Sequence, residues 1–245
     1  MRDNYKSSDF FVGKIAPFLL FEIEFHSLFH VVERLKDDRS YTELNPAAQS
    51  AFITLFSYFE AYCKHQFAAI VNLFPSLVQP FATRRGEPKV EISTIASFAG
   101  NIENSLGFIL AETYDFGTAK AINGLYRDLL GISPFSADEE REFNRISLNR
   151  NLLVHHGGFY TFQYARSIQN LPIGSFNRAF FDSVRIDTEE FGILSDFLFE
   201  MAMKITRQSV KAVMALPNWT SVEEDPERKN AVQELLRGIH GYLDD

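Results

Sequence analysis

The residues with the clearest chemical potential in this chain are Arg150, Asn151 and His155, which His156 and two glycines follow directly. Histidine titrates near neutral pH, so it can accept or donate a proton during a reaction. Arginine presents a planar, permanently charged group with several N–H donors, which suits phosphate oxygens. An arginine and a histidine on one helix could therefore support chemistry at a phosphodiester bond.

Two other interpretations of these residues need no phosphate chemistry. Arg150 and His155 could form a structural polar pair, since a cation near the C-terminal end of a helix is stabilised by the helix dipole. A metal site built from His155, His156 and Glu60 is disfavoured, because adjacent residues of a helix point to different sides. We therefore predict no metal and no other cofactor.

The helix that must position these residues has clear signals at both ends. Ser136 and Glu139 form a capping box, in which each side chain binds the backbone N–H of the other residue. Gly157 and Gly158 favour a left-handed cap at the other end. The sequence predicts a helix that begins at the box and runs to about His155 or His156.

One side of this helix contains a residue that does not fit a core. At 100° per residue, apolar side chains fall within an arc of roughly 100°. The residues of this arc are Phe143, Ile146, Leu153 and Val154. Arg150 falls inside the arc, and burying an unpaired charge costs several kcal/mol, so something must compensate it.

A second side of the helix carries two leucines, Leu148 and Leu152. His155 lies beside Leu148 on the helical wheel, and Asn151 lies between His155 and the first arc. We interpret this side as facing the same helix of a second copy of the chain. His156 falls with Asn149 on a third side, which we assign to solvent.

Apolar spacing predicts helices along most of the remaining chain, so the expected fold class is all-α. The predicted helices cover residues 17–35, 46–73, 118–130, about 187–215 and a short stretch after Pro226, with 93–115 forming one helix or two. Residues 75–93 and 159–185 read as irregular, the latter with at most a short strand pair. We expect a single domain over residues 1–245, with a core at about 46–158 and a C-terminal extension at about 187–242.

Composition limits the classes of function. The net charge of -8 and the isoelectric point near 5.3 count against a broad nucleic-acid-binding face, although a local basic site remains possible. Arg84, Arg85 and Lys89 form a small cluster that is more typical of a solvated loop than of RNA contact. The single cysteine, and the lack of a signal peptide or an uncharged membrane span, indicate a cytoplasmic protein.

Glu60 is the one acidic residue that could join the arginine and histidine. It borders an apolar stripe of the 46–73 helix, four residues after Phe56. It could be a solvated residue that pairs with Lys64, or it could reach a polar site shared with another helix. The sequence leaves both interpretations open.

The pattern Arg150-Asn151-x-x-x-His155 closely resembles the RxxxxH motif of the HEPN superfamily, in which asparagine can hold the second position. The stretch Ser57-Tyr58-Phe59-Glu60-Ala61-Tyr62 resembles the early HEPN helix with its embedded acid. Together the two resemblances cover roughly residues 46–158. The chain looks closest to the RiboL-PSP-associated or MAE-type branch of that superfamily.

The resemblance implies an HEPN-like helical bundle that forms a homodimer through the motif helices. It further implies metal-independent endoribonuclease activity at a site shared by both copies, with Arg150 and His155 catalytic and Asn151 and Glu60 supporting them. Such proteins often act as toxins or in phage defence, so an antitoxin or another defence-system protein is an expected partner beside the RNA substrate.

Two alternatives to the ribonuclease remain. The first is a non-catalytic helical module that binds or regulates a partner protein and uses the same helix only to build an interface. The second is a protein that binds nucleotides without cleaving RNA, which the lack of a glycine-rich phosphate loop disfavours.

Overall fold

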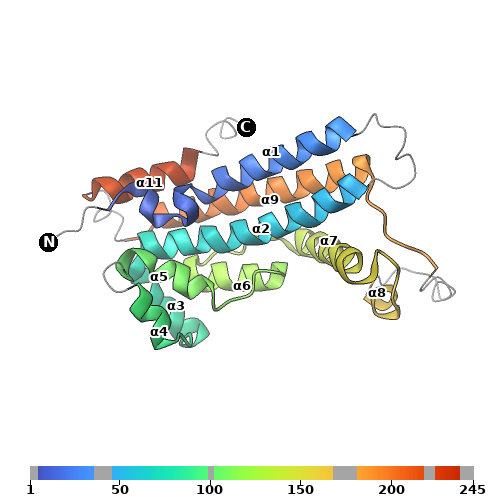
Figure 1. Cartoon of the computed structure of the whole chain (residues 1–245). Helices are drawn as coiled ribbons and strands as arrows, with labels where there is room; N and C mark the ends of the chain where they lie inside the picture. Colours follow the sequence, from blue (N-terminus) through green and yellow to red (C-terminus); the bar gives the residue numbers. More distant parts are fainter. Residues whose placement is uncertain (1–4, 36–45, 99–101, 168–180, 218–223, 238–245) are drawn as a thin grey trace. The chain divides into compact units, whose positions relative to one another are not determined.

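The fold is described from a computed structural model, which places residues 5–35, 46–98, 102–167, 181–217 and 224–237. These ranges contain ten α-helices, three short 3-10 helices and no strand (Figure 1). The only β-type pairing within them is an isolated antiparallel bridge between Phe159 and Ser183. The predicted all-α class is confirmed, and none of the described helices is long and apolar enough to cross a membrane.

The chain divides into two compact units. The first comprises Met1–Ile23, Glu60–Phe135 and Glu200–Asp245, and the second comprises Glu24–Phe59 and Ser136–Phe199. Three long helices contribute residues to both units: α1 (Pro17–Leu35), α2 (Pro46–Leu73) and α9 (Thr188–Met214). The unit boundaries do not follow the limits expected for the core and the extension, and the single-domain organisation stays a prediction.

Local capping explains why several helices have the predicted limits. In α7 (Ala137–His156) the Ser136 hydroxyl accepts from the Glu139 N–H, and Glu139 accepts from the Ser136 N–H at 2.7 Å. The helix ends at Gly157, whose φ of 59° is left-handed. Helix α6 (Ala119–Leu130) begins after Thr118, whose hydroxyl accepts from the Ala121 N–H at 3.1 Å. These contacts involve only neighbouring residues, so the sequence alone predicts them.

Residues 75–93 are more regular than predicted. They form a 3-10 turn, η4 (Pro75–Leu77), then α3 (Val78–Arg85) and the start of α4 (Ile92–Ser97). The prediction of an irregular connection is wrong because Phe81 is fully buried, with its ring centroid 5.6 Å from that of Phe67. Helix α4 and α5 (Ile102–Ala111) confirm that residues 93–115 hold two short helices.

The second unit is held together by contacts between aromatic rings. Ring centroids of Phe25 in α1 and Phe199 in α9 lie 4.7 Å apart. The ring of Phe143 in α7 lies 5.3 Å from that of Phe56 and 5.5 Å from that of Phe59, both in α2. These contacts fix the N-terminal half of α7 against α2.

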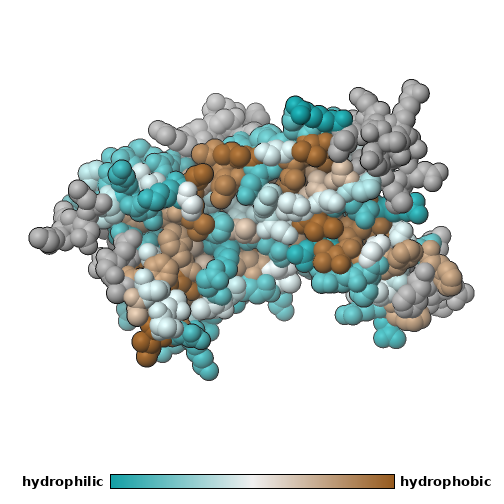
Figure 2. Space-filling model, in the orientation of Figure 1, coloured by the Kyte–Doolittle hydropathy of each residue, from teal (hydrophilic) through white to brown (hydrophobic). Residues whose placement is uncertain are grey.

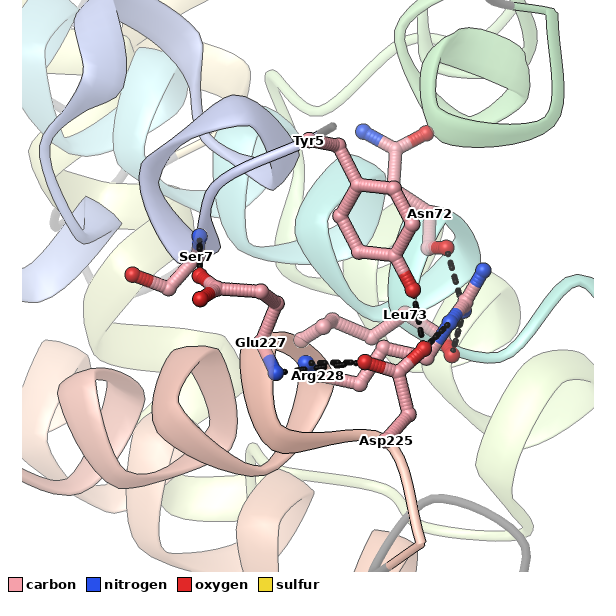
Figure 3. A network of polar contacts seen from close by, with 7 residues as sticks. All are labelled: Tyr5, Ser7, Asn72, Leu73, Asp225, Glu227 and Arg228. Atoms are coloured by element: carbon pink, nitrogen blue, oxygen red, sulfur yellow. Dashed lines mark hydrogen bonds and ion pairs between the residues drawn. The ribbon is translucent and has the colours of Figure 1, made fainter. Parts of the chain in front are cut away.

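In the first unit, the N-terminal segment is bound to the last helix, α11 (Pro226–Arg237), by the polar network of Figure 3. Arg228 donates to the carbonyls of Asn72 and Leu73 at 3.2 and 2.5 Å, which satisfies groups at the C-terminal end of α2. The carboxylate of Asp225 caps α11 by accepting from the Arg228 N–H, and it accepts a second bond from the Tyr5 hydroxyl.

Some sequence-based expectations fall outside the described residues. They concern the break between the first two helices at 37–40, the cap Asn45, the stop at Trp219 and the apolar residue Ile239. The last residues of the expected C-terminal extension, 238–242, also lie outside them.

The stability contributed by Asp225 should depend on pH. Burial alone would raise the pKa of this carboxyl, but bonds from Tyr5 and from backbone N–H groups, with the charge of Arg228, leave it below its usual value. A lowered pKa gives stability above the unfolded value of about 3.9, and this is lost as the pH falls through the folded value.

We expect Asp225→Asn to lower the free energy of unfolding at neutral pH by on the order of 1 kcal/mol, the usual size for charge-assisted hydrogen bonds. Urea denaturation of both proteins should show this difference shrinking as the pH falls below about 4 and through the lowered folded pKa, where the Asp225 carboxyl becomes neutral like the asparagine. A difference that stays constant down to about pH 3 would contradict the pKa assignment.

Candidate functional site

Arg150 lies half-buried in the C-terminal half of α7, and its guanidinium makes two contacts within the second unit. Its Nη1 donates to Oδ1 of Asn151 at 3.1 Å, and its Cζ lies 5.6 Å from the centroid of the Phe56 ring. A guanidinium over an aromatic face gains electrostatic attraction, and its methylene stem can lie along apolar surface. These contacts explain how the helix accommodates an arginine in a core-facing arc.

His155 is exposed in the last turn of α7, and Asn151 is exposed four residues before it. Residues four apart share one side of a helix and are separated by about 6 Å along its axis. The structure thus brings Arg150 and Asn151 into contact and places His155 at the solvent-facing end of the same helix. His156 is also exposed, as predicted.

The buried side of α7 differs from the predicted arc. Val154 was expected to face the core, yet 44% of it is exposed. Leu152 was expected at an interface between copies, yet it is buried within the chain, with 3% exposed. Asn149, assigned to solvent, is also buried. The core-facing side is therefore rotated toward Asn149 and Leu152.

The cause of this rotation is the segment after α7, which turns back and covers that side. The Tyr164 hydroxyl in α8 (Phe162–Ser167) donates to Oδ1 of Asn149 at 2.7 Å. Burial, followed by the neighbouring Tyr160, raises the pKa of Tyr164 to about 12, so the hydroxyl keeps its proton at neutral pH. Helix α8 lies within residues 159–185, which the sequence predicted to be irregular, so this helix was missed.

Two glycines make the turn back possible. Gly157 has φ 59° and Gly158 has φ 85°, both in the left-handed region that favours glycine. The Gly158 carbonyl accepts from the Val184 N–H at 2.8 Å, and the Tyr160 N–H donates to the Asp182 carbonyl at 2.8 Å. The stretch after the turn is thereby paired with residues 182–184, as a single bridge instead of a strand pair.

Glu60 is not in the same unit as the other predicted site residues. It lies in the first unit, where its Oε1 would be 3.0 Å from a Cβ atom added to Gly117. The nearby Lys64 forms an ion pair with Glu112 at 2.6 Å. The described geometry joins Arg150 and Asn151, and the supporting role of Glu60 stays a prediction.

The basic cluster of the first unit is used for internal contacts. Arg84 donates to the Asp128 carbonyl at 2.7 Å, and Arg85 pairs with the Asp128 carboxylate at 2.8 Å. Arg85 also lies over the ring of Tyr114, at 5.3 Å from its centroid. These contacts favour a structural role for the two arginines. Within the described ranges no group of three or more acidic, histidine or cysteine side chains could hold a metal ion.

Replacing the two glycines of the turn should have unequal effects. Gly157→Ala meets no atom closer than 3.9 Å, so it should cost only the left-handed backbone penalty of about 1–2 kcal/mol. Gly158→Ala pays the same penalty and places its Cβ 2.7 Å from the Val184 carbonyl oxygen, so the pairing with residues 182–184 must shift.

Urea denaturation should therefore show a clearly larger loss of stability for Gly158→Ala than for Gly157→Ala. Hydrogen exchange should show that Gly158→Ala also exposes the N–H groups of Tyr160 and Val184. Equal losses in the two variants would contradict the close approach at Gly158.

Comparisons with known proteins identify no relative: no family model, no curated protein and no solved structure matches the chain. The HEPN resemblance consequently rests on the residues of the motif and of the 46–73 helix alone.

Proposed function

We propose that the chain is a metal-independent endoribonuclease of the HEPN type, active as a homodimer that pairs the α7 helices of two copies. The observation that carries the proposal is the arrangement at the end of α7. Arg150 is held from behind by the Phe56 ring and by Asn151, while His155 stays exposed at the same helix end. This arrangement places an exposed imidazole and a fixed positive charge on the C-terminal half of one helix.

The chemistry requires three things of these residues. The RNA 2′-oxygen attacks the adjacent phosphorus while its proton passes to a base, the bond from phosphorus to the 5′-oxygen breaks, and that oxygen receives a proton from an acid. His155 can serve as base or acid. Arg150 can bind the phosphate oxygens, whose negative charge increases in the transition state. The products are a 2′,3′-cyclic phosphate and a free 5′-hydroxyl.

One copy supplies a single suitable histidine, whereas the reaction uses both a base and an acid. Two copies would provide two histidines and two arginines around one phosphate. In this proposal Asn151 orients Arg150, and Glu60 has a supporting role that comes only from the family resemblance. A toxin or phage-defence role, with an antitoxin or defence-system partner, belongs to the same proposal and has the same origin.

A second candidate is a non-catalytic module that binds a partner protein through the end of α7. The exposed fractions of Val154 and Phe159, 44% and 52%, favour this alternative. Apolar side chains grouped on a surface often mark an interface. The two candidates are separated by RNA cleavage in the His155→Ala and Arg150→Ala variants, since only the ribonuclease proposal expects cleavage and its loss.

We expect His155→Ala and Arg150→Ala each to reduce cleavage of single-stranded RNA at least about 100-fold, the range for removal of an acid, a base or a transition-state contact. Cleavage by the unaltered protein should persist in EDTA. His156→Ala is the matched control, because His156 lies at the same exposed helix end but outside the proposed site.

Arg150→Ala also removes packing against Phe56, so thermal unfolding must show that each variant is folded. Arg150→Lys provides a milder test, since it keeps the charge and loses the planar fork. The ribonuclease proposal fails if the unaltered protein does not cleave RNA, or if folded His155→Ala and Arg150→Ala cleave it as fast as His156→Ala does.

A further inference from the structure

The region around the end of α7 has a charge balance that differs from that of the whole chain. The protein has 32 acidic residues, yet none occurs between Phe143 and Phe181. The described part of that stretch contains Arg150 and Arg166 besides the two histidines of α7, and also Arg145, which forms ion pairs with Glu142 and Glu190. A basic stretch inside an acidic protein is a local feature that the net charge conceals.

The same region exposes aromatic rings. Phe159 is 52% exposed and Phe162 is 54% exposed, whereas most of the phenylalanines described are packed in the two units. Phe181, beside the paired residue Asp182, is 83% exposed. Figure 2 shows apolar surface in the part of the molecule that holds α8, next to hydrophilic surface. Grouped exposed rings usually indicate a binding surface.

The rings are attached to anchored backbone. Phe159 forms the bridge with Ser183, and Phe162 begins α8, whose Tyr164 is buried and bonded to Asn149. The ring centroids of Tyr160 and Tyr164 lie 4.9 Å apart, which further fixes the segment between the two phenylalanines. A fixed ring loses little conformational entropy when a flat ligand stacks on it.

Two positive charges follow Phe159 and Phe162 in sequence, one on each side of Phe181. Arg166 is exposed in the last turn of α8, and Arg185 is exposed two residues after the bridged Ser183, with its Nε 3.5 Å from the serine hydroxyl. Exposed aromatic faces with cations close by in the sequence suit a polymer of flat bases and phosphates, although Asp182 and Asp187 flank Arg185. They suit a protein partner less well, because most protein surfaces carry both signs of charge.

We propose that Phe159 and Phe162 are stacking residues for the unpaired bases of single-stranded RNA, and that Arg166 and Arg185 bind its phosphates. This inference rests on the proposed ribonuclease function and specifies its substrate class. Duplex RNA is excluded as the preferred ligand, because its bases are stacked on one another and cannot lie on protein rings. The site would hold the strand beside His155, which is four residues before Phe159.

The test measures RNA binding without cleavage. A fluorescent single-stranded oligonucleotide is titrated with full-length His155→Ala protein, and anisotropy gives the Kd. Adding Phe159→Leu or Phe162→Leu keeps an apolar side chain but removes the ring, and each should raise the Kd about ten-fold, within the range for loss of one stacked base. Ile92→Leu, at an 83% exposed position of the first unit, is the control and should leave the Kd unchanged.

Salt dependence tests the phosphate contacts separately. Arg166→Gln and Arg185→Gln should each reduce the slope of log K against log salt by about 0.7, the value for one phosphate of a single strand. Lys120→Gln removes the same charge from an exposed position of α6 and should leave the slope unchanged. Circular dichroism confirms that the variants are folded.

The inference is overturned if the leucine variants bind single-stranded RNA as tightly as their parent, or if duplex RNA binds equally well. It is also overturned if the leucine variants lose self-association in sedimentation while their RNA affinity is kept, since the rings would then form a protein interface. Ring-dependent binding without cleavage by the unaltered protein would sink only the ribonuclease proposal. Cleavage with ring-independent binding would sink only the stacking site.

Discussion

The turn back after α7 is the constraint on which the arrangement around Arg150 depends. Gly157 and Gly158 adopt left-handed backbone conformations, and the close approach of Gly158 to the Val184 carbonyl lets the chain pair with residues 182–184. This pairing directs α8 over Asn149 and buries the adjoining side of α7. The opposite side, with Asn151 and His155, is left exposed. A local backbone requirement thus decides which face of the helix is available for chemistry.

Helices whose limits are set by neighbouring residues could be predicted from the sequence. Pro17, Pro46 and the capping box at Ser136 act within one helical turn, so α1, α2 and α7 start where the pattern indicates. Helices α3 and α8 were missed because tertiary contacts decide them. Phe81 is buried against Phe67, and Tyr164 is bonded to Asn149, so both short helices form through partners far along the chain or in another helix. Sequence spacing does not reveal such partners.

The candidate site could be predicted only in part, for a similar reason. The misfit of Arg150 among apolar residues is visible in the sequence, and the structure adds the Phe56 ring that accommodates it. The helical wheel placed Val154 inward and Asn149 outward, because it assumed that one core covers one arc. Because α8 packs over Asn149, a second side of α7 is also buried. The boundary between the buried and exposed sides of α7 is therefore rotated from its predicted position. The supporting role expected for Glu60 stays a prediction, because Glu60 belongs to the first unit and Arg150 to the second.

The acidic net charge does not decide whether this protein binds RNA. Charges on a solvated surface act over about 8–10 Å at physiological salt, so the many carboxylates beyond that range contribute little to the potential at any one site. In the proposed site the local charge comes from Arg150, Arg166 and Arg185, within and beside a stretch from 143 to 181 that has no acidic residue, and from Asp182 next to it. The remaining acids still reduce non-specific attraction of RNA to the rest of the surface. If RNA bound only at the C-terminal end of α7, the rest of the surface would have a weak affinity for RNA, while this one end would bind a single strand.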